Sequence, residues 1–298
     1  MRLLVIGNGF DIDLGILTTY KDFFEKTDYG KDSVAKGSLE DYLYYKYRQC
    51  KDYGLNWFDV EESIAEYIKT KVMPVHNTMV EIDKMHLKNL KCQFYDYIID
   101  NWTEKSSNLW KEPIKQSLAK ALIEKQNRVK CFSKIYSFNC LDYNMLDIAS
   151  GLEIEKLNDV VYLHGHSSDF IFGVAEEDCM YEEYSFLVKK NQTGYPTKDV
   201  EMFKEYLLKA EEVVIFGHSL NRIDMSYFKS FFEHFSHAKK TVVFVTKDQQ
   251  SKISIINNIS KYAIPFEMLV ESGRVVFLLT DDFNNQYMSK DFKLLLGS

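Results

Sequence analysis

Apolar and polar positions follow two different patterns along this chain, and the change between them lies near residue 130. Continuous apolar runs, which are typical of parallel strands buried on both faces, occur at residues 3–6 and again at residues 132–138, 160–164, 170–174, 213–217 and 241–246. Stretches with helical spacing separate most of them, at residues 141–149, 180–191, 199–211 and 224–236. Strands that alternate with helices predict an α/β fold with a doubly wound, mostly parallel sheet.

Between residues 12 and 130 the pattern is helical throughout. Thr18 or Thr19 is suited to cap a first helix, because a hydroxyl can accept a hydrogen bond from a free backbone amide of the first turn. Apolar positions then recur at helical spacing over residues 34–50, 57–72 and 75–126. We therefore expect a sheet core made of residues 1–30 and 128–298, with residues 31–127 forming a large all-helical insertion after the first strand.

The composition of the 298 residues narrows the setting in which the protein works. No apolar stretch is long enough to span a membrane, and the first residues lack the basic flank and processing site of a signal peptide. Five scattered cysteines without a Cys-x-x-Cys pair argue against disulfides or a zinc module and for a reducing cytosol. A formal charge of −7 gives no electrostatic case for binding nucleic acid. We expect a cytoplasmic protein without membrane or nucleic-acid partners.

Polar residues gather where four of the predicted strands end. In a doubly wound sheet, ligands bind beyond the carboxyl ends of the strands, close to the place where the strand order reverses. Side chains and glycines at four such ends would therefore share one edge. The four groups are Gly7-Asn8-Gly9-Phe10-Asp11, Asn139 with Asp142, His164-Gly165-His166, and Gly217-His218-Ser219 with Asp224.

Each of these groups also has an ordinary structural interpretation. A Gly-x-Gly turn often only permits close packing of a strand and a helix, and here position 12 is Ile where a dinucleotide fingerprint has its third glycine. Asn139 or His218 with Ser219 can cap a helix, and His164 can be a core histidine. Asp142 and Asp224 lie in the first turns of predicted helices, where a carboxylate needs no ligand. Only their joint position at four strand ends favours a site.

The same residues resemble the signature of the AbiH family of phage abortive-infection proteins. The resemblance covers roughly residues 1–235, with its motifs in the expected order. It rests on Gly7-Asn8-Gly9-Phe10-Asp11, Gly15-Ile16-Leu17-Thr18-Thr19-Tyr20-Lys21-Asp22-Phe23, Trp57-Phe58-Asp59-Val60-Glu61, Ser137-Phe138-Asn139, Leu163-His164-Gly165 and Gly217-His218-Ser219-Leu220 with Asp224.

More remotely, these blocks are similar to the sirtuin-type NAD-binding fold, which implies a Rossmann-like nucleotide-binding core. The resemblance implies that Asn139 and His164 are catalytic. It implies nucleotide-binding roles for Gly7, Asn8, Gly9, Phe10, Asp11, Asp142, Gly217, His218, Ser219 and Asp224. One extra residue separates Asn139 from Asp142, Leu17 stands where AbiH proteins commonly have proline, and Cys140-Leu141 replaces the usual Tyr-Thr.

The sirtuins' four-cysteine zinc site is missing here, which favours hydrolysis of NAD over protein deacylation. The resemblance thus implies an antiphage effector that cleaves NAD, as substrate rather than cofactor, to nicotinamide and ADP-ribose. The alternative is a nucleotide-binding sensor or adaptor without turnover. A nuclease or a P-loop nucleotide kinase ranks third, because the chain is acidic and has no Gly-x-x-x-x-Gly-Lys-Ser/Thr loop.

Cleavage of the glycosidic bond develops positive charge on the ribose. In the expected mechanism the amides of residues 7–9, at the following helix N-terminus, hold the pyrophosphate. Asn139 orients a ribose hydroxyl or water, and His164 is the general base. His166 would face the same side as His164, but no third ligand is evident, so no metal site is predicted. The phage trigger, homo-oligomerisation and the roles of Trp57, Asp59 and Glu61 stay open.

Overall fold

The computed structural model describes residues 1–33, 35–54, 58–71, 76–109, 117–143, 157, 159–166, 170–235, 240–262, 266–286 and 295. They form two compact units, which we describe separately. Unit 1 consists of Met1–Ile16, Trp102–Leu163 and Pro196–Ser298, and unit 2 of Leu17–Asn101 and His164–Tyr195. The expected boundaries divide the chain differently, chiefly because residues 164–195 group with the helical segment.

Unit 1 is built on a parallel sheet that, in the described residues, has six strands. Its order across the sheet is β3-β2-β1-β4-β5-β6, and every neighbouring pair is parallel. This is the strand order of doubly wound folds that bind dinucleotides, so the predicted fold class is confirmed. The strands are β1 (Arg2–Ile6), β2 (Lys134–Ser137), β3 (Val160–Tyr162), β4 (Glu212–Phe216), β5 (Thr241–Thr246) and β6 (Val275–Leu279).

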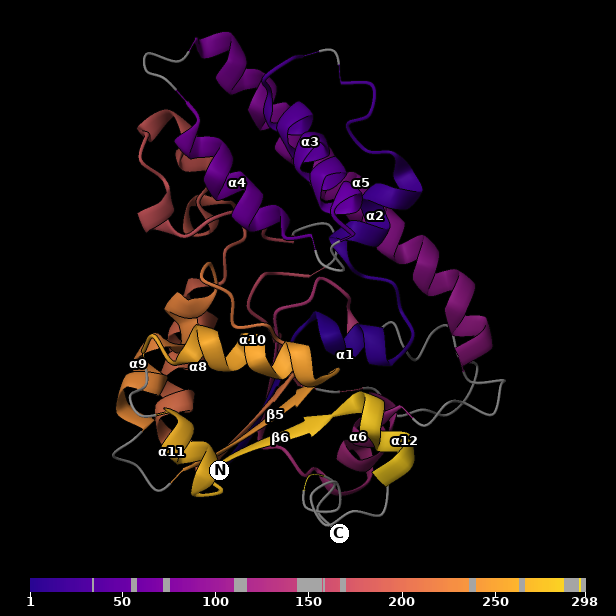
Figure 1. The fold of residues 1–298 in the computed structure, drawn as a ribbon, viewed down its shortest axis with the longest axis vertical. Coiled ribbons are helices and arrows are strands. Elements are labelled where there is room, and N and C mark those ends of the chain that lie inside the picture. Colours follow the sequence, from indigo (N-terminus) through magenta and orange to yellow (C-terminus); the bar gives the residue numbers. More distant parts are fainter. Residues whose placement is uncertain are drawn as a thin grey trace. The chain divides into compact units, whose positions relative to one another are not determined.

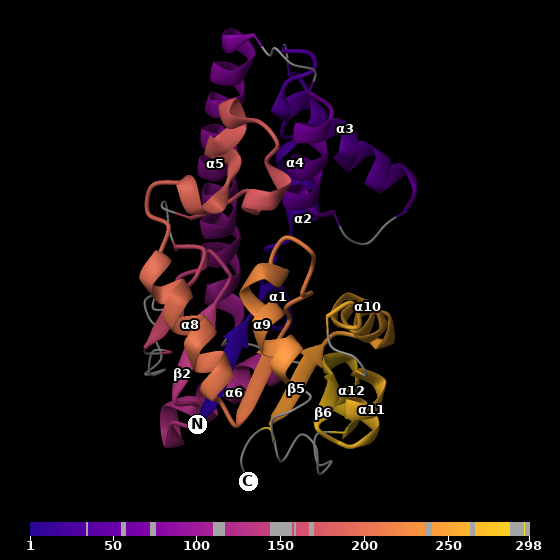
Figure 2. The same cartoon turned by 90° about the vertical axis from the view of Figure 1, so that its left-hand side faces the viewer.

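Helices cover both faces of this sheet (Figures 1 and 2). From β1 the chain steps towards β2, whereas from β4 it steps the opposite way to β5. Since both crossovers are right-handed in such folds, their helices lie on opposite faces; α6 is on one and α8 and α9 are on the other (Figure 1). The helices are α1 (Asn8–Asp13), α6 (Leu118–Val129), α8 (Thr197–Lys209), α9 (Met225–Phe235), α10 (Gln249–Ile259), α11 (Phe266–Glu271) and α12 (Thr280–Gln286).

Unit 2 contains α2 (Tyr20–Thr27), α3 (Leu39–Asp52), α4 (Val60–Lys69) and most of the long helix α5 (Asn77–Leu109). Three of these helices begin at the side-chain caps Thr19, Ser38 and Asp59, which each accept a hydrogen bond from the third backbone amide after them. The core between them is aromatic, and Phe23 and Phe24 are completely buried among the rings of neighbouring helices. This packing accounts for many of the chain's aromatic residues.

Two expected elements differ from the structure, and one observed strand was not expected. Residues 170–174 form no sheet strand; they lie in unit 2, where Val174 makes an isolated bridge to Val188. The expected helix 180–191 consists instead of the short 3-10 helices η4 (Glu182–Leu187) and η5 (Lys189–Asn191), which follow η3 (Glu176–Asp178). Strand β6 has no counterpart among the expected strands. Most of the expected helix 141–149, and Trp57, lie outside the described residues.

Candidate functional site

The strand order of unit 1 reverses between β1 and β4, which are neighbours in the sheet although about 210 residues separate them in sequence. The turns that follow these two strands carry Gly7 and Gly9 on one side and Gly217 and His218 on the other. Because ligands of doubly wound sheets bind at such a reversal, this edge of unit 1 is the candidate site.

The glycines of the two turns allow their backbones to approach closely. A Cβ atom on Gly7 would lie 2.6 Å from the His218 Cα atom, and one on Gly217 would lie 2.4 Å from the Gly9 Cα atom. Gly217 also has a φ of +68°, which favours glycine. Close packing therefore explains all three glycines.

This packing also engages the backbone amides that were expected to hold a phosphate. Gly7 N–H donates to the Phe216 carbonyl and Gly9 N–H to the Gly217 carbonyl, both at 2.8 Å. In this structure the two amides thus join the turns, and α1 after them has only six residues. A ligand at this edge would have to be held by groups other than these two amides.

Three buried polar side chains lie together at the ends of β1 and β2. The Tyr143 hydroxyl donates to the Asp11 Oδ1 atom at 2.6 Å and accepts a hydrogen bond from the Asn139 Nδ2 atom at 2.8 Å. Asp11 follows β1, Asn139 follows β2, and all three residues are at most 7% exposed. The structure therefore brings Asp11 and Asn139 together, through a tyrosine that the sequence did not single out.

Burial keeps the hydroxyl of Tyr143 protonated. Burial and the neighbouring Asp11 carboxylate raise the pKa of the Tyr143 phenol well above 10, and the same two causes raise the pKa of the Cys140 thiol. A protonated phenol can donate to Asp11 while it accepts from Asn139. The Tyr143 hydroxyl donates to Asp11 and accepts from Asn139, and it therefore fixes the orientation of the Asn139 amide.

Asp142 joins this network through a second tyrosine. The Tyr162 hydroxyl, at the end of β3, accepts a hydrogen bond from the Tyr143 backbone amide at 2.9 Å and lies 3.2 Å from the Asp142 Oδ1 atom. The rings of Tyr143 and Tyr162 stack with an interplanar angle of 13°. Three strand ends of unit 1 therefore share one polar network.

The predicted residues after β4 form a separate arrangement. His218 accepts a hydrogen bond from Leu220 N–H at its Nδ1 atom (3.0 Å), so its proton lies on Nε2, which is 3.6 Å from the Asp224 Oδ2 atom. Ser219 is exposed, and its carbonyl accepts a hydrogen bond from Asn258. Phe10 is fully buried, against Phe216 among others, and supports the turn. Asn8 is partly exposed beside it.

His164 belongs to unit 2, where it is part of a buried charged cluster. The Lys189 Nζ atom lies 3.3 Å from His164 Nε2 and 2.9 Å from Glu61 Oε2, and Glu61 Oε1 accepts a hydrogen bond from Gly173 N–H at 3.1 Å. His164, Lys189 and Glu61 are each at most 6% exposed. His166, two residues further on, is exposed. Lys189 is a member of the cluster that sequence reasoning missed.

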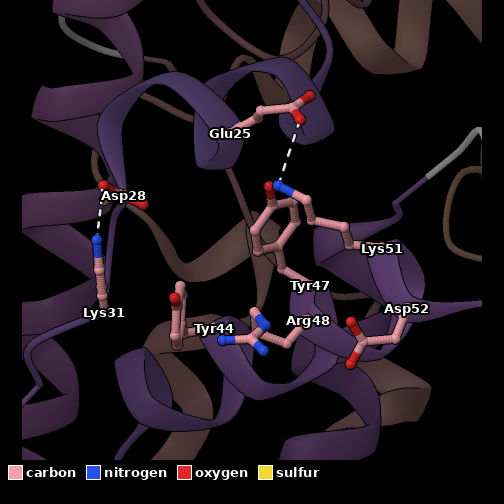
Figure 3. A pocket seen from close by; sticks show the side chains of 8 residues that line it. All are labelled: Glu25, Asp28, Lys31, Tyr44, Tyr47, Arg48, Lys51 and Asp52. Atoms are coloured by element: carbon pink, nitrogen blue, oxygen red, sulfur yellow. Dashed lines mark hydrogen bonds and ion pairs between the residues drawn. The ribbon is translucent and has the colours of Figure 1, made fainter.

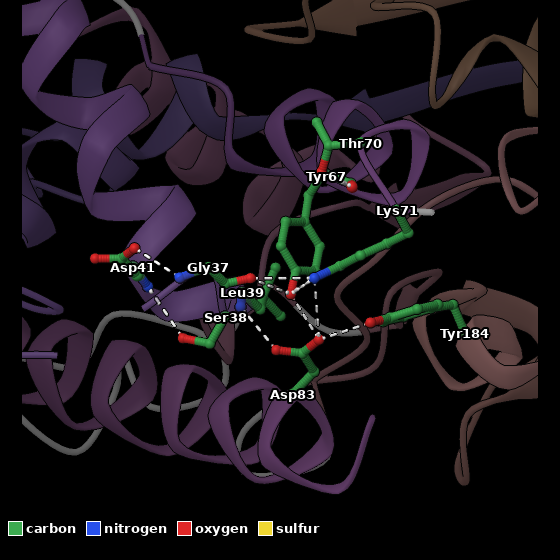
Figure 4. A network of polar contacts seen from close by, with 9 residues as sticks. All are labelled: Gly37, Ser38, Leu39, Asp41, Tyr67, Thr70, Lys71, Asp83 and Tyr184. Carbon is green, nitrogen blue, oxygen red and sulfur yellow. Dashed lines mark hydrogen bonds and ion pairs between the residues drawn. The ribbon is translucent and has the colours of Figure 1, made fainter. Parts of the chain in front are cut away.

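A second buried network of unit 2 surrounds Asp83 (Figure 4). Asp83 is completely buried and accepts hydrogen bonds from Leu39 N–H (2.7 Å), the Tyr67 hydroxyl (2.6 Å) and the Tyr184 hydroxyl (3.0 Å). Burial lowers the pKa of Lys71, whose ammonium group lies 3.9 Å from the Asp83 carboxylate and over the Tyr67 ring. These contacts tie the helices of unit 2 to the segment that carries Tyr184.

The surface of unit 2 has a hollow of about 340 Å³ between α2 and α3. Figure 3 shows two ion pairs here: Lys51 of α3 pairs with Glu25 of α2, and Lys31 pairs with Asp28 at one side of the hollow. Its lining carries equal numbers of acidic and basic side chains, which is typical of a solvated surface.

Asp59, whose role the sequence left open, caps α4.

Two classes of feature are absent from the part of the chain that the structure describes. No described helix combines the length and the apolar character that crossing a bilayer requires. Nor do three His, Cys, Asp or Glu side chains gather as metal ligands among the described residues.

Comparison with known proteins gives results of three kinds. No curated protein matches the chain. Two solved sirtuin structures align with it: one is a Sir2 complex with the inhibitor EX-527, 2'-O-acetyl-ADP-ribose and a deacetylated p53 peptide, and the other concerns sirtuin substrate affinity. Each is 12% identical with a TM-score of 0.38, covering 98% of this chain and 94% or 93% of the solved chain. The model of the family described as bacteriophage abortive infection AbiH matches residues 3–246. The chain therefore belongs to the AbiH family.

Proposed function

We propose that this AbiH protein acts in defence against phage by binding NAD at the reversal of strand order in unit 1 and hydrolysing it to nicotinamide and ADP-ribose. The observation that carries the proposal is the buried Asp11–Tyr143–Asn139 network at the ends of β1 and β2. Polar side chains are costly to bury unless they are paired. Their position at the edge where doubly wound sheets bind ligands favours a functional role.

The network suits a reaction that develops positive charge on a ribose. The Asp11 carboxylate supplies a negative charge, and Tyr143 holds the Asn139 amide by one of its hydrogens. The Asn139 amide oxygen accepts no hydrogen bond from the residues that the structure describes. It is therefore suited to accept one from a ribose hydroxyl or from the attacking water.

The test is nicotinamide release from NAD by the purified full chain and in cells before and after infection. We expect the unchanged protein to release nicotinamide and Asn139→Ala to lower the rate by about 10²-fold or more, the usual scale for removing one group that acts on the transition state. His164→Ala tests the predicted base in the same assay. The matched control is Asn89→Ala, which removes the same amide from the exposed face of α5.

Equal rates for Asn139→Ala and Asn89→Ala would contradict the site. If NAD or ADP-ribose raises the thermal stability of the protein while no nicotinamide appears under any condition, the protein is a nucleotide-binding sensor without turnover. Ligand at about 100 times its Kd stabilises a protein by about 2.7 kcal/mol, which is readily measured.

A further inference from the structure

The charged cluster of unit 2 determines which nitrogen of His164 carries a proton. A lysine ammonium has three donors and no acceptor, and Lys189 directs its Nζ atom at His164 Nε2 over 3.3 Å. A ring nitrogen that accepts from an ammonium has no proton of its own. In the neutral imidazole the proton must then be on Nδ1.

Lys189 is held in its charged form by Glu61. The carboxylate lies 2.9 Å from the ammonium, and its second oxygen is fixed by the Gly173 backbone amide. Both side chains are buried, and buried charges persist when they are paired and hydrogen-bonded. Glu61 from α4 thus keeps Lys189 from η5 charged and aimed at the imidazole.

We propose that Lys189 and Glu61 are positioning residues that hold His164 as a neutral imidazole protonated on Nδ1. An imidazolium would place a second positive charge 3.3 Å from the ammonium, and a like charge at that distance disfavours protonation. Lys189 contacts His164 directly, and Glu61 acts on it through Lys189. Segment 171–173, which also reaches the cluster, contributes only apolar residues and backbone.

The catalytic consequence of this arrangement rests on the proposed function. As long as Lys189 occupies Nε2, that nitrogen can take a proton from water only after the ammonium moves away. His164 also stays neutral at pH values where an ordinary histidine would be protonated. The acid side of the pH–rate profile of NAD hydrolysis is therefore flat around pH 6 in the unchanged protein.

The first measurement is ¹⁵N NMR of the full chain labelled in its histidine rings, with the His164 signals assigned by their loss in His164→Gln. We expect a neutral ring with its proton on Nδ1 from pH 5.5 to 8. A proton on Nε2, or protonation of His164 with a midpoint near pH 6.5, would overturn the proposal. This measurement needs neither substrate nor activity, so its outcome is independent of whether the protein hydrolyses NAD.

The second measurement compares Lys189→Met with Lys190→Met. Lys190 is the next residue and pairs with Glu176 at the exposed surface, so its substitution removes the same charge away from the cluster. In Lys189→Met we expect the titration midpoint of His164 to rise by one pH unit or more, a tenfold change in its protonation equilibrium, and an acid limb to appear in the pH–rate profile. A purely structural Lys189 would change stability alone and leave the midpoint where it was.

Removing one member of a buried ion pair can unfold a protein. The double variant Glu61→Gln with Lys189→Gln removes both charges and keeps the possibility of a hydrogen bond between the two side chains. Its His164 must also titrate at higher pH than in the unchanged protein. An unchanged midpoint in this variant contradicts the proposal.

Discussion

Replacing Tyr143 by Phe removes one oxygen atom from the centre of the polar network and leaves the ring in place. The ring at position 143 keeps its edge-on packing against Phe10 and its stacking on Tyr162. Two hydrogen bonds are lost, one to the Asp11 carboxylate (2.6 Å) and one from the Asn139 amide (2.8 Å). The substitution therefore tests the network without creating a large cavity.

The expected loss of stability follows from these two bonds. A hydrogen bond to a charged group contributes about 1.5–3 kcal/mol and a neutral one about 0.5–1.5 kcal/mol. Since Asp11 is only 1% exposed, water does not replace the lost donor. We expect the free energy of unfolding to fall by about 2–4 kcal/mol. At a slope of about 3 kcal/mol per molar urea, the unfolding midpoint of unit 1 moves down by about 1 M.

The matched control is Tyr136→Phe in the neighbouring strand β2. Tyr136 is 1% exposed, packs against Phe203, and has a pKa raised to about 12 by burial. Its hydroxyl has no hydrogen-bond partner among the described residues, so its loss is expected to change stability by less than about 0.5 kcal/mol. Urea titrations followed by tryptophan fluorescence and circular dichroism compare the two variants. Equal losses in both would refute the assigned role of Tyr143.

Two further predictions concern the turns of unit 1 and a buried carboxylate. Gly217→Ala should lower the free energy of unfolding by more than about 3 kcal/mol, because it adds a 2.4 Å clash with the Gly9 Cα atom to an unfavourable positive φ. In the control Gly15→Ala, position 15 has a φ of +81° but open space around it, so the loss should be only about 1 kcal/mol. Equal urea midpoints for the two variants would contradict the close packing of the two turns. Burial raises the pKa of Asp13 above 3.8, so its contribution to stability is present below pH 3.8 and is lost as the pH rises through the folded-state pKa. Asp13→Asn should therefore gain stability relative to the unchanged chain between pH 4 and pH 7, and a gap that narrows with rising pH would contradict this sign.

The sequence predicted the sheet well where apolar runs are buried on both faces. The runs at residues 132–138, 213–217 and 241–246 correspond to β2, β4 and β5. Residues 170–174 have the same composition but no sheet strand, because Phe170 and Phe172 pack against Phe94 and Tyr20 in the core of unit 2. A short apolar run shows that a segment is buried and cannot show which neighbours bury it.

The residues of the candidate site were predictable only in part. Asp11 and Asn139 follow the ends of strands, where the ligands of doubly wound sheets bind, so the sequence identified them as candidates. Tyr143 reads as one more core aromatic in a chain with 20 tyrosines, and its bond to Asp11 joins positions 132 residues apart. Lys189 lies in a polar stretch, and lysines are almost never buried. Only three-dimensional contacts assign these two residues a role.

The central position of β1 in the sheet has a consequence for how the chain folds during synthesis. Leu3 pairs with Lys134 of β2 and with Val213 of β4. Strand β1 therefore stays unpaired until these two strands have been synthesised. At about 5–20 residues per second, roughly 7–26 s pass before β2 has been synthesised and roughly 10–42 s before β4 has. During that time an apolar segment of high aggregation propensity remains unpaired. Helices α2 to α5 all lie within residues 20–109 and can form before β2 is synthesised. The sheet edge with its buried network is therefore completed late in synthesis.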